Sequence, residues 1–373
     1  MSIRATELPF DASVRAKAEP LAIRRAALWA LLVSKLITGW GVQWDIQWHV
    51  LIGRDSFWIP PHLLTYAGVG AAVLLSFGVL LWETSRGTGP VRIVGLSGTR
   101  GFHLAAWGIA VTILAAPVDD LWHRLFGLDV TLWSPPHLMG LLGAAINAAG
   151  CLVIAREVYP AGGLSRLAAM VFSGALLYAT LHLILDPSFR MAYLYGGVRY
   201  HTFAILASIL LPLALVPAAR LTANRWAPVL VLVLVVAMGM AGQRIARVGF
   251  EIVQPVSVIE DEIAKDPTSP IAVATIMGRK NGTTPGRVGG WPLMVMGIGP
   301  VLALSLVDAR TRPLAATLAF GIVLFGVASW LLPGRPALAP MAPGLAPSAM
   351  AFALTIAAAL LGGMTATRLS EAL

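Results

Sequence analysis

Apolar runs of about 20 residues recur along nearly all of the 373-residue chain, and this feature limits the accessible folds more than any other. Because about 20 mostly apolar residues in a helix span the hydrocarbon core of a bilayer, each run predicts a membrane-spanning helix. Only 12% of the residues are charged, whereas a soluble domain carries roughly 25%. The sequence therefore predicts an all-α, multispanning transmembrane helix bundle that sits in the lipid bilayer.

The positions of the runs and of the basic residues predict a topology. The expected spans lie near residues 26–44, 62–82, 102–118, 137–155, 167–186, 201–217, 227–243, 291–308, 314–332 and 349–366. Arginines gather in alternate links between these spans, and such links face the cytoplasm. This pattern predicts about ten spans with both termini cytoplasmic. The net charge of +9 lies mostly in these links, so it does not indicate a nucleic-acid partner.

The distribution of polar residues divides the chain into three expected parts. Residues 1–25 form a cytoplasmic N-terminal segment, and residues 26–217 form a six-span metal-binding bundle of three hairpins. Residues 218–373 form a His-free bundle of four spans with a long outer loop at 243–290. In this loop "VIEDEIAKD" predicts a short surface helix and "GRKNGTTPGRVGG" a turn region, and we favour a lid or contact role over a catalytic one.

Six of the seven histidines lie at the outer ends of the first three predicted hairpins. In the first hairpin Asp45 and His49 are four residues apart, which places them on one face of a helix. Two prolines then start the next helix, and His62 follows them directly. One carboxylate and two imidazoles form a three-ligand metal site with room for water or oxygen. Asp45, His49 and His62 are therefore the candidate metal ligands and the candidate catalytic residues.

The second hairpin repeats this pattern with Asp119, His123 and His137. The repetition predicts an internal hairpin repeat with two similar metal sites. Four charged residues near the two sites are candidates to orient the ligands from outside the coordination sphere: Arg54, Asp55, Asp120 and Asp129. For Asp55, a structural ion pair with Arg54 is an equal alternative.

The third hairpin carries a looser version of the pattern. His182 and Asp186 are four residues apart in the reverse order, and His201 opens the next span. These three residues could form a third site, support the other sites, or form an unrelated polar cluster. His103 stands apart at the other end of a span, and we interpret it as a hydrogen-bonded structural residue.

The ligand types suit several metals, because imidazole with carboxylate binds copper, zinc, iron or nickel. The single cysteine excludes a thiolate-rich metal site and an internal disulfide. Spacing by itself does not choose among these metals.

One stretch resembles the metal-site motif of the C subunit of the copper membrane monooxygenases, the particulate methane, ammonia and hydrocarbon monooxygenases. The motif reads Asp45-x2-Trp48-His49-x4-Arg54-Asp55-x4-Pro60-Pro61-His62-x3-Tyr66. The resemblance covers about residues 26–160. It implies copper at the first site and a second copper at Asp119, His123 and His137, where Asp119 replaces the asparagine of the family. It also implies other membrane subunits as partners, among them one that contains a cupredoxin.

The expected function is that of a copper-binding subunit of the bacterial inner membrane, with its metal sites toward the periplasmic face. The resemblance implies O2-dependent hydroxylation of a small apolar substrate, which makes the chain part of an enzyme. Copper occupies one or two sites in this interpretation, and zinc or iron remain alternatives. Two other functions stay open: a metal transport or delivery protein, and a structural subunit of a membrane complex.

Overall fold

The computed structural model describes residues 12–53, 56–126, 133–185, 195–280, 282 and 296–373. The first part of the chain forms α1 (Ala12–Leu51), α2 (Pro60–Arg86), β1 (Val91–Ile93), β2 (Leu96–Gly98), α3 (Arg100–Phe126), α4 (Pro135–Val158) and α5 (Leu164–Leu185). The rest forms η1 (Gly197–His201), α7 (Thr202–Leu210), α8 (Pro212–Thr222), α9 (Ala227–Val253), α10 (Ile259–Lys265), α11 (Pro270–Lys280), α13 (Ile298–Val307), α14 (Pro313–Leu331), η2 (Ala339–Met341) and α15 (Leu345–Ala372). The predicted all-α helical bundle is confirmed, with one antiparallel two-stranded hairpin added between α2 and α3.

In the described residues, eight helices are long and apolar enough to cross a membrane, with η1, α7 and α8 counted together as one. They contain eight of the ten expected spans. The expected span at 26–44 lies inside α1. The expected span at 291–308 is described only from residue 296, and this described part contains α13. The number ten therefore stays a prediction, whereas the helices have the length and composition of a multi-pass membrane protein.

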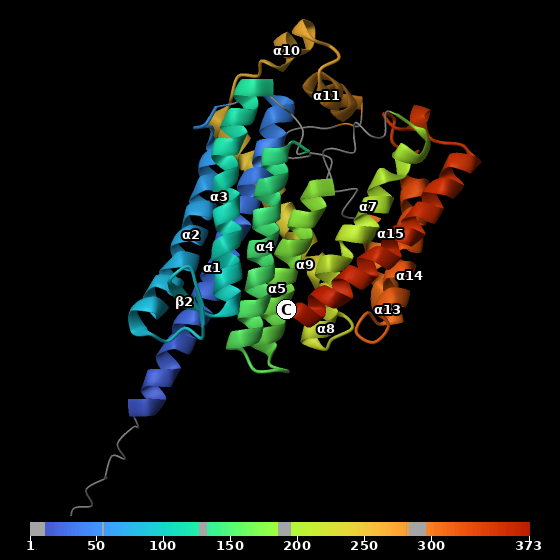
Figure 1. Cartoon of the computed structure of the whole chain (residues 1–373). Helices are drawn as coiled ribbons and strands as arrows, with labels where there is room; N and C mark the ends of the chain where they lie inside the picture. Colours follow the sequence, from blue (N-terminus) through green and yellow to red (C-terminus); the bar gives the residue numbers. More distant parts are fainter. Residues whose placement is uncertain (1–11, 54–55, 127–132, 186–194, 281, 283–295) are drawn as a thin grey trace, which may run out of the picture.

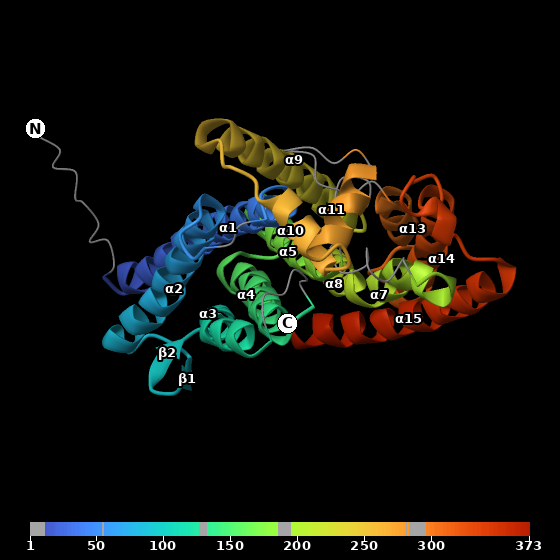
Figure 2. The same ribbon diagram turned by 90° about the horizontal axis from the view of Figure 1, so that it is seen from above.

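The helices form two neighbouring groups (Figures 1 and 2). In the first group α1, α2, α3, α4 and α5 lie side by side, and α9 packs against α1 and α5. In the second group α15 packs along α7, α8 and α14, and α13 packs against α14. A helix from the later part of the chain thus completes the bundle of the first hairpins. The expected boundary between residues 217 and 218 remains a prediction.

Both ends of the described chain lie at one end of the bundle, and α10 and α11 lie at the other (Figure 1). We call the end where α1 finishes at Leu51 and α2 begins at Pro60 the site end. There α9 continues to Val253, beyond the expected end of its span at 243, and stops two residues before Pro255. A proline cannot continue a helix and disfavours the helical conformation of the residue before it, which explains this end point.

The segment after α9 contains two helices at the site end. The short helix predicted from "VIEDEIAKD" is confirmed as α10, with acidic residues in its first turn. The helix α11 begins at Pro270 and takes in the start of "GRKNGTTPGRVGG". Of the predicted turn region, residues 281 and 283–290 lie outside the described residues.

Glycines bring α3 and α4 into close contact along their length. A Cβ atom at Gly143 would lie 2.6 Å from the backbone nitrogen of Thr112, and one at Gly108 would lie 2.5 Å from that of Asn147. Small residues allow this approach, which dispersion forces and hydrogen bonds stabilise inside a membrane. The Asn147 side chain donates a hydrogen bond of 2.6 Å to the backbone oxygen of Ala105 across the same contact. This packing fixes where the second hairpin presents its polar residues.

Candidate metal site at the ends of the first two hairpins

The first cluster joins α1 to α2 through one carboxylate. Asp45 Oδ1 lies 3.1 Å from His62 Nε2 and 3.4 Å from His49 Nδ1. All three side chains are partly exposed, whereas the Oδ1 atom of Asp45 is itself buried. The structure thus brings together the three residues that the sequence predicts for the first site.

Local sequence explains how His62 reaches Asp45. Pro60 and Pro61 occupy the first positions of α2, and Ile59 precedes them in an extended conformation. Proline suits these positions because its fixed φ matches a helix and its missing N–H would have no partner there. The helix therefore starts immediately beside the end of α1, with His62 in its first turn.

The separations in this cluster can be compared with those in a coordination sphere. Two ligand atoms bound tetrahedrally at about 2.0–2.1 Å from one metal lie about 3.4 Å apart. The two distances from Asp45 Oδ1 are close to this value. The negative charge of the carboxylate also favours a cation bound beside it. The donor types and these two separations fit a first-row transition metal such as copper or zinc.

The cluster is nevertheless not a preformed three-ligand shell. Within the described parts of the chain, no group of three or more His, Cys, Asp or Glu side chains is arranged to hold a metal ion. His49 Nδ1 also lies 3.0 Å from the backbone oxygen of Asp45, and the ring centroids of His49 and His62 are 6.3 Å apart. The arrangement is that of a carboxylate that bridges two imidazoles.

In the second hairpin, the corresponding carboxylate and imidazole atoms are also in contact. Asp119 Oδ1 on α3 lies 3.5 Å from His137 Nε2, and His137 again follows two prolines that begin a helix. His123 belongs to α3, one turn after Asp119, and its side chain lies outside the described residues. Asp120 forms an exposed ion pair of 2.8 Å with Arg124. The two hairpins thus share one carboxylate–imidazole contact in corresponding places.

The third histidine pair has a different environment. His182 stacks on Tyr178 and meets Phe203 edge to face, with ring centroids 6.0 and 5.9 Å away. His201 stacks on Phe325 at 4.7 Å, and its Nε2 lies 3.3 Å from Ser348 Oγ of α15. These contacts connect the two histidines to different helices, which resembles the packing of an aromatic core more than a shared site.

Four of the predicted site residues lie outside the described residues: Arg54, Asp55, Asp129 and Asp186. His103, interpreted as structural, has its Nε2 3.2 Å from the backbone oxygen of Val91 in β1.

Sequence reasoning missed the aromatic cluster behind the first site. Trp48 stacks on Phe250 of α9 at 5.9 Å, and Trp44 meets both rings edge to face. This cluster occupies another face of α1 than the one that carries Asp45 and His49. The spacing of four residues between Trp44 and Trp48 was a signal for a packing face, but nothing in the sequence identified Phe250 as the partner.

The segment before α10 closes the end of the helix that carries Asp45 and His49. The backbone N–H of Val258 donates a hydrogen bond of 2.8 Å to Ile52 O, and Ser257 Oγ donates one of 2.7 Å to Leu51 O. The last carbonyl groups of a helix have no partners within that helix. These bonds therefore cap α1 and hold its end in place beside α2.

No protein-family model matches the sequence, and comparisons with curated proteins and with solved structures gave no match either.

Proposed function

We propose that the chain is an integral membrane subunit that binds copper at the site end. The observation that carries this proposal is the placement of Asp45 Oδ1 between His62 Nε2 and His49 Nδ1, at 3.1 and 3.4 Å. Two imidazoles and a carboxylate from two helices are ligand types that suit a copper ion. The resemblance to copper membrane monooxygenases favours copper over zinc and iron.

The predicted ligands would form two copper sites, one at each hairpin. Asp45, His49 and His62 would hold one ion, and Asp119, His123 and His137 a second. The negative charge of each aspartate would compensate the metal charge at the rim of an apolar bundle, where an unpaired cation is costly. The cap on α1 and the stacking of Trp48 on Phe250 keep the helix end fixed while a ligand exchanges. Bound copper would supply a redox-active Lewis acid for reactions with O2.

In the full proposal, this subunit supports O2-dependent hydroxylation of a small apolar substrate that reaches the site from the bilayer. The site end then faces the periplasm of a bacterial inner membrane. Other membrane subunits, one with a cupredoxin domain, would deliver electrons and complete the enzyme. These parts rest on the sequence resemblance.

The copper proposal is tested by metal content per chain. The wild type, His49→Ala and the control His103→Ala would be purified from copper-supplied membranes and analysed by mass spectrometry. We expect His49→Ala to lose one copper per chain. His103→Ala should keep the wild-type amount, because His103 contacts the backbone of β1 at the other end of the bundle. Equal copper in all three proteins, each folded by circular dichroism, would refute the first site.

The catalytic part needs its own measurement. Membranes that contain the whole complex should hydroxylate small hydrocarbons in an O2-dependent reaction, and His49→Ala should abolish it. If the His49→Ala protein has lost its copper but its turnover is unchanged, this ion has no catalytic role. The copper-binding proposal would not be affected by that result.

A further inference from the structure

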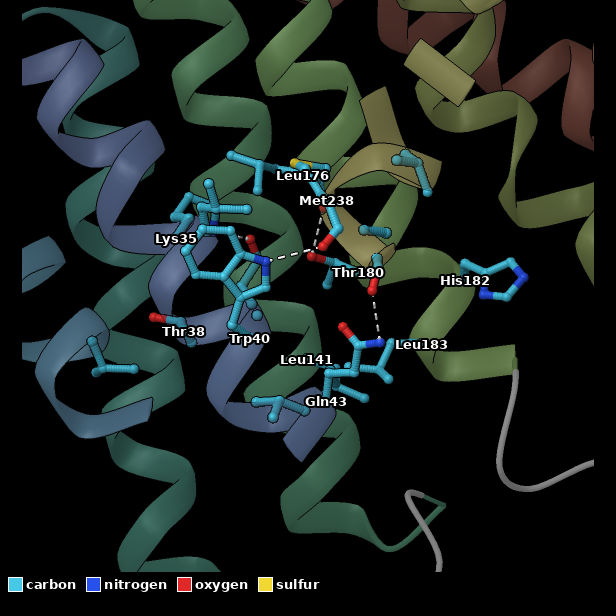
Figure 3. Close-up of a pocket in the computed structure, with 18 of the residues that line it drawn as sticks. Lys35, Thr38, Trp40, Gln43, Leu141, Leu176, Thr180, His182, Leu183 and Met238 are labelled. Atoms are coloured by element: carbon cyan, nitrogen blue, oxygen red, sulfur yellow. Dashed lines mark hydrogen bonds between the residues drawn. The ribbon is translucent and has the colours of Figure 1, made fainter. Parts of the chain in front are cut away.

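A cavity of about 200 Å³ lies inside the first group of helices (Figure 3). Its walls come from α1, α2, α3, α4, α5 and α9, and most lining side chains are apolar. An apolar cavity of about 150 Å³ is large enough to bind benzene. The space therefore suits a compact organic molecule slightly larger than benzene.

Lys35 is the feature that distinguishes this cavity. It is the only charged side chain among the described residues that line the space, and it is buried. Its Nζ donates one hydrogen bond of 3.0 Å to the backbone oxygen of Ala144 on α4. A lysine ammonium has three hydrogens to donate, so this bond uses one of them.

No carboxylate balances this charge. In the part of the chain that the structure describes, none of the ion pairs involves Lys35, and the lining contains neither Asp nor Glu. Ionisable groups within membrane-spanning helices are rare and mark binding sites or pathways, because an unbalanced charge there is unfavourable. A ligand with one negative charge would supply the missing partner.

Three other polar groups of the wall donate hydrogen bonds to backbone oxygens of the protein. Trp40 Nε1 donates to Met238 O at 3.0 Å, and Gln43 Nε2 donates to Gly239 O at 3.2 Å (Figure 3). Thr180 Oγ1 donates to the backbone of its own helix at 2.8 Å. The bonds of Trp40 and Gln43 join α1 to α9 and stabilise the wall. They leave Lys35 as the group that selects the charge of a ligand.

We propose that this cavity binds a small organic monocarboxylate with a compact apolar body. The carboxylate would accept hydrogen bonds from Lys35 Nζ, and the apolar body would fill the space toward Trp40 and Leu176. A single ammonium matches one negative charge, which disfavours phosphate and dicarboxylates. The site involves neither Asp45 nor the histidines of the first metal cluster, so it is independent of the copper proposal.

Benzoate is a probe of the right size and charge, and benzamide is its neutral counterpart. Binding of each would be measured by titration calorimetry on the full chain in lipid nanodiscs. The test variant is Lys35→Met, which keeps the approximate length of the side chain and removes its charge. The control variant is Lys265→Met, because Lys265 is an exposed residue of α10. We expect saturable benzoate binding at least tenfold tighter than that of benzamide. Lys35→Met should weaken benzoate binding at least tenfold, and Lys265→Met should leave it unchanged.

A second variant keeps the test decisive if Lys35→Met does not fold. Ala179→Leu adds bulk to the cavity wall and preserves Lys35, so it should remove benzoate binding by occupying the space. The proposal is overturned by any of three results: no saturable benzoate binding to the wild type, equal affinity for benzamide, or unchanged binding in folded Lys35→Met. Unchanged binding in Ala179→Leu would overturn the placement of the ligand in this cavity.

Discussion

At the residue scale, Asp45 connects two imidazoles that belong to different helices. Its carboxylate contacts one histidine of its own helix and one at the start of α2. The sequence predicted the first contact from a spacing of four residues and the second from a short link that ends in two prolines. Both contacts are local in the chain, which is why they could be predicted without a structure.

Asp45→Asn should weaken copper binding by about tenfold or more, because the amide keeps the size of the side chain and loses its negative charge. The affinity would be measured by competition with a chelator of known strength. The control is Glu371→Gln, since Glu371 pairs with Arg220 near the C-terminus, away from both metal clusters. Asp45→Asn protein with wild-type affinity would show that the carboxylate does not contribute to the site.

Trp48 tests the anchoring of α1 to α9. Its side chain is buried against Phe250, so Trp48→Ala should destabilise the protein by about 3 kcal/mol. Trp58→Ala is the control, because Trp58 is 70% exposed and its loss should change stability by less than about 0.5 kcal/mol. Both values would come from unfolding in mixed detergent micelles. Equal stability of the two variants would contradict the anchoring role.

At the element scale, the two hairpins depend on close contact between helix backbones. In α3 and α4 this contact relies on Gly108 and Gly143, whose Cβ positions are occupied by the facing helix. The sequence showed glycines in apolar runs, but the facing surfaces of two helices are set by their rotation about their axes. Because that rotation depends on packing against all neighbours, the glycine contacts became visible only in the structure.

Gly143→Leu should separate α3 from α4 and lower the thermal stability of the protein strongly, since the backbone of a facing helix cannot yield. Because α4 carries His137, the same variant should lose the second copper. Gly78→Leu is the matched control: Gly78 has nothing within 4 Å of its Cβ position. Thermal unfolding and copper content would be measured for both proteins. A Gly143→Leu protein as stable as Gly78→Leu would contradict the role of this glycine in the contact between α3 and α4.

At the scale of the whole molecule, the ends of the described part of the chain, from Ala12 to Leu373, lie opposite α10 and α11 (Figure 1). The proposed topology puts the ends in the cytoplasm and the site end in the periplasm. Because the single native cysteine, Cys151, is buried, introduced cysteines can report this sidedness.

A cysteine in place of Thr268, exposed between α10 and α11, should react with a membrane-impermeant thiol reagent added to intact cells from which the outer membrane has been removed. A cysteine in place of Ser85, exposed at the opposite end of α2, should react only after the cells are lysed. The chain with its native Cys151 is the background control. The reverse pattern would place the metal cluster on the cytoplasmic side and contradict the proposed topology.

Local patterns in the sequence specify the helices and the residues grouped at their ends, because apolar runs, proline starts and spacings of four residues act within short stretches. The sequence therefore predicted the bundle and the neighbourhood of Asp45, His49 and His62. Only the tertiary structure decided what surrounds them. Phe250 packs on Trp48 from about 200 positions away, and the space beside Lys35 is lined by residues of six helices. Such contacts depend on how each helix is rotated and paired, and packing across the entire bundle sets those rotations.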